Sequence, residues 1–140
     1  MPATHGRSRI RRTFPHFGVN VHVLQPGEPA SKYHAEGAQE AFLVLQGECL
    51  LIVDDEERRL RQWDFFHAAP WTPHVLVGAG TDPSAILMVG GRFPGKGIVY
   101  SVSEAAARYG ASVEKETSSP QEAYAGWRRP APARRPWPPG

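Results

Sequence analysis

The sequence is poor in three features, each of which would have identified a class of protein. It contains a single cysteine, Cys49, among 140 residues, which excludes an intramolecular disulfide and a zinc site built from several cysteines. No apolar stretch approaches the roughly 18–20 residues that a membrane-spanning helix requires. The arginines near the N-terminus are not followed by an apolar run, so a secretory signal is not expected. We therefore expect a cytoplasmic protein without a membrane segment.

Acidic residues are missing from both ends of the chain. Residues 1–12 and residues 128–140 each carry four arginines and no Asp or Glu. Removing these eight positive charges from the formal net charge of +2 leaves residues 13–127 with a net charge of −6. This acidic body argues against a nucleic-acid-binding domain with a basic face, so nucleic-acid binding is only a third hypothesis. We predict one folded domain at 13–127 between a flexible basic tail and a flexible Pro/Arg-rich tail, because neither tail can bury enough apolar surface to become ordered.

The central region has the alternation and the turn residues typical of short β-strands. Val19, Val21 and Val23 alternate with polar residues, a period-2 pattern that indicates a strand with two unlike faces. About eight short runs follow one another between residues 18 and 92, separated by turns rich in Gly and Pro. This spacing predicts an all-β fold, an antiparallel jelly roll or β-barrel. Two short C-terminal helices are expected after Ser103 and Ser119, both of which are favourable N-cap residues.

Two histidines and two carboxylates lie at positions from which they could converge. His34 and Glu36 are two residues apart on one predicted strand and therefore share a face. Glu40 begins the next strand, and His74 opens a later strand that could lie beside them. Two imidazoles and a carboxylate in an apolar cup would suit a first-row divalent metal ion. The alternative is that the histidines are ordinary hydrogen-bonded residues and that Glu40 is protonated or paired with an arginine.

Over residues 18–92 the sequence resembles the cupin superfamily, in particular small single-domain bacterial cupins. Its first motif is matched at Gly27, His34, Glu40 and Gly47, and its second motif at Asp64, Pro70 and His74. The resemblance implies a barrel that holds Fe, Mn, Ni or Zn through His34, Glu36, Glu40 and His74. Glu36 replaces the second histidine of the first motif, which leaves it as a ligand, a general base or a rim residue.

Five further residues are predicted to line a small-molecule pocket beside the metal: His22, Tyr33, Phe42, His67 and Trp71. Trp71 stands where the second motif usually has glycine, so it could wall the pocket, although tryptophan is penalised at a positive φ. Phe42 continues the face on which Glu40 lies. Three of the five have alternative locations: an exposed strand position for His22, the barrel rim for Tyr33 and the core for His67.

The favoured function is binding of one divalent metal ion and a small molecule, with a metal-dependent reaction of oxygenase, isomerase or lyase type. Metal chemistry is favoured because the candidate set lacks a Ser or Cys nucleophile with a positioned base. The alternative is a non-catalytic small-ligand-binding or sensor module. The substitutions at Glu36, Trp63 and Trp71 mildly favour that alternative.

A homodimer is expected because the runs Ala41–Leu45 and Cys49–Val53 are apolar on both faces. A half-solvated antiparallel strand would carry polar residues on one face, so both runs need a second covering layer. Large apolar patches on soluble proteins usually mark interfaces. The helical stretch 103–125 is the competing cover, and its small alanines predict only a partial lid.

Overall fold

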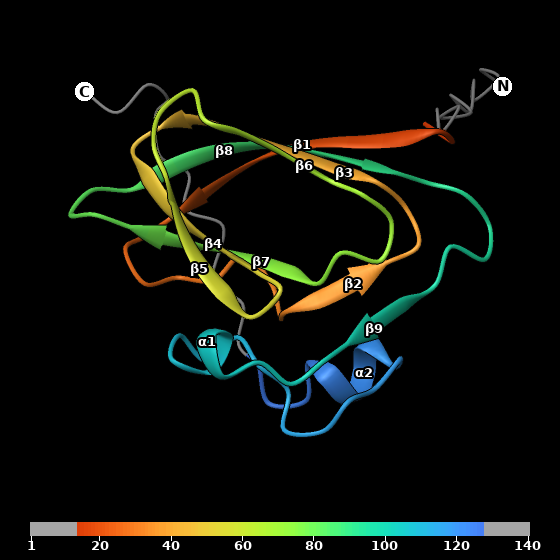
Figure 1. The fold of residues 1–140 in the computed structure, drawn as a ribbon. Helices are drawn as coiled ribbons and strands as arrows, with labels where there is room; N and C mark the ends of the chain where they lie inside the picture. The colour runs from red at the N-terminus through yellow and green to blue at the C-terminus, as the bar shows by residue number, and fades with distance from the viewer. Residues whose placement is uncertain (1–13, 128–140) are drawn as a thin grey trace, which may run out of the picture.

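The computed structural model describes residues 14–127, which contain nine strands and two short helices (Figure 1). The strands are β1 Phe17–Leu24, β2 His34–Glu36, β3 Glu40–Gln46, β4 Glu48–Val53, β5 Glu56–Leu60, β6 Phe65–Ala68, β7 His74–Ala79, β8 Ser84–Gly91 and β9 Ile98–Tyr100. The helices are α1 Glu104–Ala107 and α2 Pro120–Ala123. The tails predicted at 1–12 and 128–140 lie outside the described residues.

The strands form two sheets that face each other across the core (Figure 1). One sheet has the order β1-β8-β3-β6 and the other the order β5-β4-β7-β2-β9, with every neighbouring pair antiparallel. The predicted all-β antiparallel jelly roll is therefore confirmed. Strand β9 was not predicted, because three residues are too few to show a period; β9 forms by pairing with β2.

Both predicted helices are present, and each begins at its predicted serine. The side chain of Ser103 accepts a hydrogen bond from the backbone N–H of Ala106, and that of Ser119 accepts one from Glu122. These bonds satisfy donors that the first turn of a helix leaves unpaired. Neither helix in residues 14–127 has the length and apolar content needed to cross a membrane.

The main core fills the space between the two sheets. Phe42 and Val44 of β3 meet Leu51 of β4 and Leu76 of β7 there, all with exposed fractions of 4% or less. Cys49 lies in the same cluster and is fully buried, as the sequence predicted. Alternate residues of each strand point into this layer, so the remaining residues of each strand must face outward.

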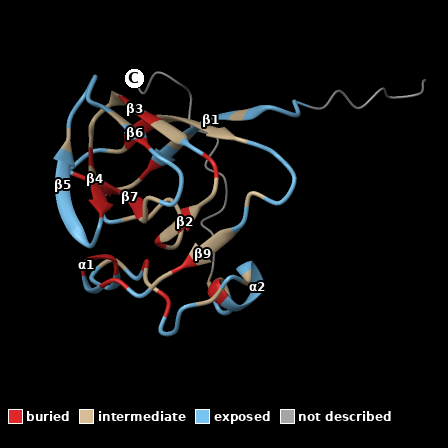
Figure 2. Cartoon of the chain, turned by 45° about the vertical axis from the view of Figure 1, so that its right-hand side comes forward, coloured by how far each residue is buried: buried red, intermediate tan, exposed pale blue. Residues whose placement is uncertain are grey.

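The outer face of the five-stranded sheet is covered by the C-terminal segment 101–127, the covering segment. Ile52 of β4, fully buried, packs with Ala105 and Ala106 of α1 and with Tyr33. Asp55, in the β4–β5 turn, accepts hydrogen bonds from Ser103 Oγ and from the backbone N–H of Ala105. These contacts hold α1 against the five-stranded sheet (Figure 2). We call this sheet the covered sheet.

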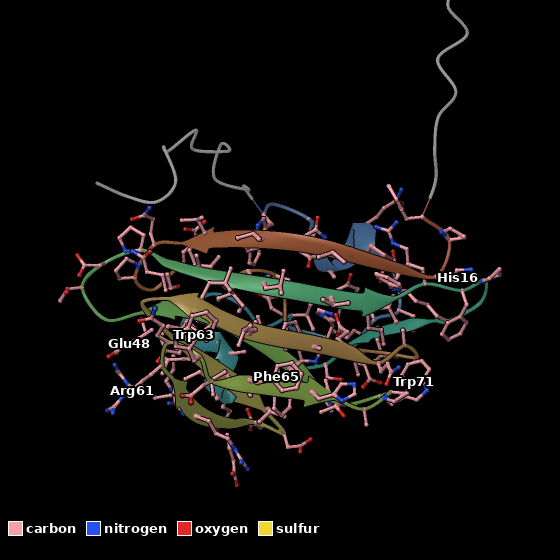
Figure 3. All side chains as sticks on the ribbon, turned by 90° about the horizontal axis from the view of Figure 1, so that it is seen from above. His16, Glu48, Arg61, Trp63, Phe65 and Trp71 are labelled. Carbon is pink, nitrogen blue, oxygen red and sulfur yellow. The ribbon has the colours of Figure 1, made fainter. Side chains whose placement is uncertain are left out.

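The outer face of the four-stranded sheet has no such cover within residues 14–127. The strand register aligns two rows of residues across this face: Val19, Val89, Ala41 and His67; and Val21, Leu87, Leu43 and Phe65. Only His67 is polar. Val21 is 55% exposed and Phe65 62% exposed, and Figure 3 looks down on this face. We call it the open sheet.

Candidate metal centre

His34 and His74 are brought together by the pairing of two strands in the covered sheet. Each is the first residue of its strand, and the antiparallel register of β2 and β7 places them directly opposite each other. Their ring centroids are 5.0 Å apart, and the exposed fractions of the side chains are 12% and 4%. His34 and His74 are forty positions apart in the sequence, and the pairing of β2 with β7 brings them together.

Each imidazole is oriented by a backbone carbonyl two residues before it. The Nδ1 of His34 lies 2.7 Å from the carbonyl oxygen of Lys32, and the Nδ1 of His74 lies 2.8 Å from that of Thr72. A carbonyl oxygen only accepts, so in both rings Nδ1 carries the hydrogen and donates. In the neutral ring this leaves the lone pair on Nε2, the tautomer that second-shell hydrogen bonds select in histidine metal ligands.

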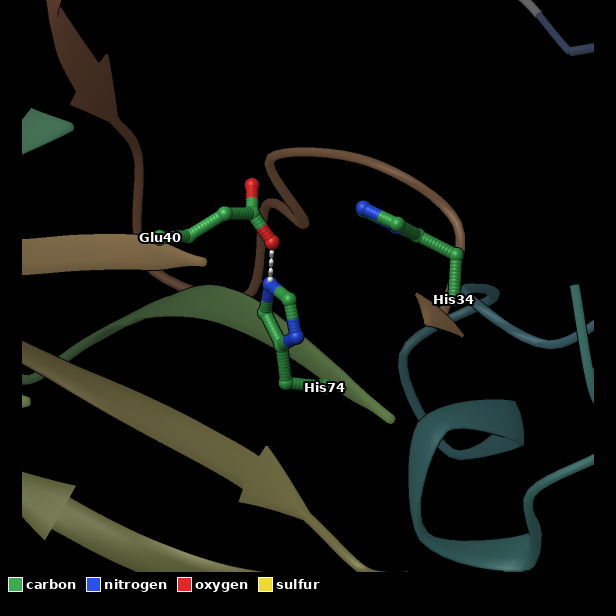
Figure 4. Close-up of side chains that lie close together, drawn as sticks. All are labelled: His34, Glu40 and His74. Carbon is green, nitrogen blue, oxygen red and sulfur yellow. Dashed lines mark ion pairs between the residues drawn. The ribbon is translucent and has the colours of Figure 1, made fainter. Parts of the chain in front are cut away.

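Glu40 completes the cluster from the open sheet. It is the first residue of β3, and its Oε2 lies 2.9 Å from Nε2 of His74. One ligand atom from each of His34, Glu40 and His74 lies within 4.8 Å of the other two, and the three side chains point toward one another (Figure 4). The donor set, two oriented Nε2 lone pairs and one carboxylate, fits a divalent metal ion.

Glu36, the fourth predicted ligand, contacts members of this cluster and also Lys96. Its Oε1 lies 3.4 Å from Nε2 of His34, and its Oε2 accepts a hydrogen bond from the Lys96 ammonium. Burial alone would raise the pKa of the Glu36 carboxyl, but its bonds to His34, Glu40 and Lys96 outweigh burial and hold that pKa well below its usual range. Glu36 is thus a carboxylate that contacts His34 beside the three-residue cluster, and its part in metal binding stays a prediction.

The same surroundings shift the pKa of His34 in the opposite direction from that of Glu36. Burial alone would lower the pKa of His34. Hydrogen bonds to Glu36 and to the Lys32 carbonyl, together with the nearby Glu40 carboxylate, outweigh burial and raise that pKa above its ordinary value. The surrounding carboxylates therefore favour a positive charge on the His34 imidazole.

A cavity of about 260 Å³ opens beside the three residues. His22 and Phe42, two of the predicted pocket residues, line it. The position of His22 follows from the alternation of β1, which turns the valines to the outer face of the open sheet and His22 to the inner face. The volume suits a small metabolite.

The other three predicted pocket residues lie elsewhere, and this part of the prediction is corrected. Tyr33 is buried under α1, where its hydroxyl accepts a hydrogen bond from the Asp55 backbone N–H. His67 belongs to the outer face of the open sheet, with its Nε2 at 3.1 Å from the Gln39 side chain. Tyr33 immediately precedes β2 and takes the face opposite to the cavity-lining His34 beside it. His67 lies within β6, on the face opposite to Phe66, which packs against the core.

Trp71 also lies outside the cavity lining. Its φ is +65°, the region that favours glycine, so the motif position keeps its backbone conformation despite the substitution. Trp71 is 52% exposed, and its indole ring lies against Gly37 and Gly97, where an added Cβ would come within 3.2 Å and 3.0 Å of the ring. The absence of side chains at these two glycines makes room for the ring beside the β8–β9 connection.

Sequence analysis missed two cavity-lining cations, Arg92 and Lys96. Both lie in the connection from β8 to β9, at or beyond the end of the region that carries the motifs. A cation in a loop rich in Gly and Pro belongs to no periodic pattern and to no motif spacing that would show from the sequence that it lines a cavity. Only the closure of the barrel brings this loop to the mouth of the cavity.

A family model described as Cupin domain matches residues 20–90, half of the chain. No match among curated proteins was found. The matched range includes His34, Glu40 and His74 and ends before Arg92 and the covering segment.

Solved structures with the same fold support this match. One, described as a sugar phosphate isomerase from a cupin superfamily of Silicibacter pomeroyi, is 28% identical with a TM-score of 0.55, over 60% of this chain and 54% of that one. A Thermus thermophilus protein is 25% identical with a TM-score of 0.53, over 59% and 79%. A cupin with a double-stranded β-helix fold from Methanocaldococcus jannaschii is 17% identical with a TM-score of 0.53, over 59% and 76%, and shows the fold alone. The chain spans about half the length of the isomerase.

Proposed function

This chain belongs to the cupin family, and we propose that its barrel binds one divalent metal ion together with a small molecule. The observation that carries the proposal is the convergence of His34, Glu40 and His74, with one ligand atom of each within 4.8 Å of the other two. The ligands come from both sheets, so the fold presents the donor set without a large rearrangement.

The donor set selects the kind of metal and leaves room for a ligand. Two imidazoles and one carboxylate suit Fe, Mn, Ni or Zn. Three protein ligands leave open positions for water or for an oxygen of the small molecule. When bound, such an ion supplies Lewis-acid or oxygen chemistry. Glu36 stays ionised beside the cluster, where Lys96 holds it, and can accept a hydrogen bond from a bound molecule.

The reaction class within this proposal is oxygenase, isomerase or lyase. Isomerisation is the first reaction to test, because the Silicibacter pomeroyi neighbour at 28% identity is described as a sugar phosphate isomerase. The proposal includes a cytoplasmic location, consistent with the free thiol of Cys49.

The experiment is elemental analysis of the protein as purified, without added metal, followed by titration with Fe²⁺, Mn²⁺, Ni²⁺ and Zn²⁺. We expect close to one equivalent of one of these metals. His34→Ala and His74→Ala should each abolish binding while the far-ultraviolet circular dichroism stays unchanged, since both residues lie at strand ends. His67→Ala is the matched control, because His67 lies on the outer face of the open sheet.

Two results would count against the metal site: no metal uptake by the wild type, or full metal occupancy in both His34→Ala and His74→Ala. A wild type that takes up no metal but still binds a small molecule would favour the non-catalytic binding or sensor module. The two functions are thus separated by one measurement on the unmodified protein.

The proposal also includes a homodimer formed through the open sheet. The four strands of the open sheet have eight, eight, seven and four residues, which at about 3.4 Å per residue and about 4.8 Å per strand gives roughly 440 Å² of projected area. This is of the order of the about 800 Å² of accessible surface that each partner buries in a standard interface. Because the two rows on this face carry no Asp, Glu, Lys or Arg, a second copy can pack on it without opposing like charges.

Light scattering at micromolar concentration tests the dimer. We expect about twice the chain mass of 15.4 kDa for the wild type and the monomer mass for Val21→Asp. Arg58→Asp is a control for added negative charge, since Arg58 is exposed on β5 of the covered sheet. A wild-type mass near 15.4 kDa would exclude the dimer.

A further inference from the structure

Two cations line the cavity, and they differ in their partners. Lys96 donates to the Glu36 carboxylate, so its charge is matched within the protein. Arg92 has no carboxylate within 4.0 Å among the residues of the described range 14–127. Within that range its guanidinium donates weakly from Nη1 to the Phe14 carbonyl, at 3.4 Å. A guanidinium has five N–H donors, so most of them are available for another partner.

A glycine makes room for this arginine on the cavity side of β1. Gly18, Asn20 and His22 alternate along β1 and line the cavity. A Cβ added at Gly18 would lie 2.7 Å from Nη2 of Arg92 and 3.0 Å from its Cζ, so the guanidinium occupies the space that a side chain would need. Glycine weakens a strand interior, and it is typical of places where another group must approach the backbone closely.

The acidic and basic side chains that line the cavity balance one another when its histidines are neutral, as they must be to bind a metal. Arg92 and Lys96 contribute two positive charges, while Glu36 and Glu40 contribute two negative ones. A divalent ion at His34, Glu40 and His74 would add two positive charges to this balance. The loaded cavity then favours an anion, and the guanidinium without a carboxylate partner is the group that can recognise it.

We propose that the small molecule bound here carries an oxyanion, a carboxylate or a phosphate, and that Arg92 is the residue that binds it. This inference rests on the proposed function, in which another part of the same molecule meets the metal ion. The planar fork of arginine pairs with two oxygens of a carboxylate or phosphate at once. Gly18 is its positioning residue, because it leaves the space in which the guanidinium lies.

The test is calorimetric titration of metal-loaded protein with three probes: succinate, neutral succinamide and inorganic phosphate. Succinate and succinamide share their carbon skeleton and differ in charge. We expect succinate or phosphate to bind and succinamide to bind at least about tenfold more weakly. Arg92→Gln should weaken anion binding by about tenfold or more, the loss expected from a charge-assisted hydrogen bond.

Matched variants separate recognition from folding and from net charge. Arg58→Gln removes the same charge from the exposed surface of β5 and should bind the anion like the wild type. Gly18→Ala should weaken anion binding, because the added methyl displaces the guanidinium. Metal content, measured before and after each titration, should be no lower in Arg92→Gln than in the wild type.

The outcomes distinguish this proposal from the metal site. If the wild type holds metal but binds succinate no more tightly than succinamide and does not bind phosphate, or if Arg92→Gln binds both anions as Arg58→Gln does, the anion proposal is wrong. If phosphate alone depends on Arg92, the ligand is a phosphate; if succinate alone does, it is a carboxylate. If the wild type takes up no metal, the proposed function fails, and the same titrations on metal-free protein still decide whether anion binding requires Arg92.

Discussion

The open sheet and the covered sheet start from the same kind of sequence and end in different surroundings. Strand β3 of the open sheet and strand β4 of the covered sheet are both apolar on both faces. Ile52, on the outer face of β4, is fully buried, whereas Val21 and Phe65, on the outer face of the open sheet, are more than half exposed. Apolar periodicity therefore shows that a face needs a cover, but not which part of the chain supplies it.

The two sheets also divide the candidate site. His34 and His74 belong to the covered sheet, which the covering segment holds from behind, and Glu40 belongs to the open sheet. Changes on the outer face of the covered sheet should therefore lower the stability of the fold. Changes in the open sheet should instead weaken metal binding or dimer formation. Four predictions test this difference, in order of decreasing effect.

The largest effect is expected from a charge on the outer face of the covered sheet. Ile52→Asp loses the packing of a fully buried isoleucine and buries an unpaired carboxylate, so we expect a loss of more than about 4 kcal/mol in the free energy of unfolding. Val21→Asp, the matched change on the open sheet, should cost less than about 1 kcal/mol. Urea unfolding at a protein concentration where the wild type is monomeric measures both. Equal losses would contradict the distinction between the sheets.

The next effect concerns the single ligand that the open sheet supplies. A metal ion at 100 times its dissociation constant should stabilise the wild type by about 2.7 kcal/mol. Glu40→Ala removes one of three ligands, so most of this stabilisation should disappear. Thermal unfolding with and without metal measures it, and Glu48→Ala, on the outer face of β4, is the control. Undiminished metal stabilisation in Glu40→Ala would remove Glu40 from the site.

A smaller effect is expected from the hydrogen bond between Tyr33 and the β4–β5 turn. Tyr33→Phe removes the hydroxyl that accepts the Asp55 backbone N–H and leaves a partly buried donor unpaired, which should cost about 1 kcal/mol. Tyr109→Phe removes an exposed bond to Glu57 and should cost less than about 0.5 kcal/mol. Chemical denaturation of both variants checks the order. The reverse order would show that the turn does not help hold the cover.

The smallest effect is on the only thiol. Burial raises the pKa of Cys49 to about 12, so the neutral thiol prevails in the folded protein at every pH up to about 10. We expect no measurable reaction with a thiol reagent under native conditions and full reaction in denaturant, because only the thiolate is nucleophilic. Rapid native reaction, followed by absorbance, would mean that the two sheets separate locally around β4.

The elements predicted most accurately are those with strong local signals. The alternation of β1 and the serine caps of both helices depend on residues within one or two turns of the chain, and all three are present. Strand β9 was missed because it exists through its pairing with β2. Tyr33, His67 and Trp71 were misplaced because sequence proximity to the site does not give the face on which a side chain lies.

The sequence by itself determined which residues form strands, where the helices begin, and which histidines and carboxylate are candidates for a metal. These depend on short-range periodicity, on caps and on motif spacing. Only the tertiary structure decided that Glu36 is engaged by Lys96, that Arg92 lies against Gly18, and that α1 covers β4 while β3 stays open. These contacts join residues that lie far apart in the chain, and long-range pairing of this kind leaves no periodic mark in the sequence.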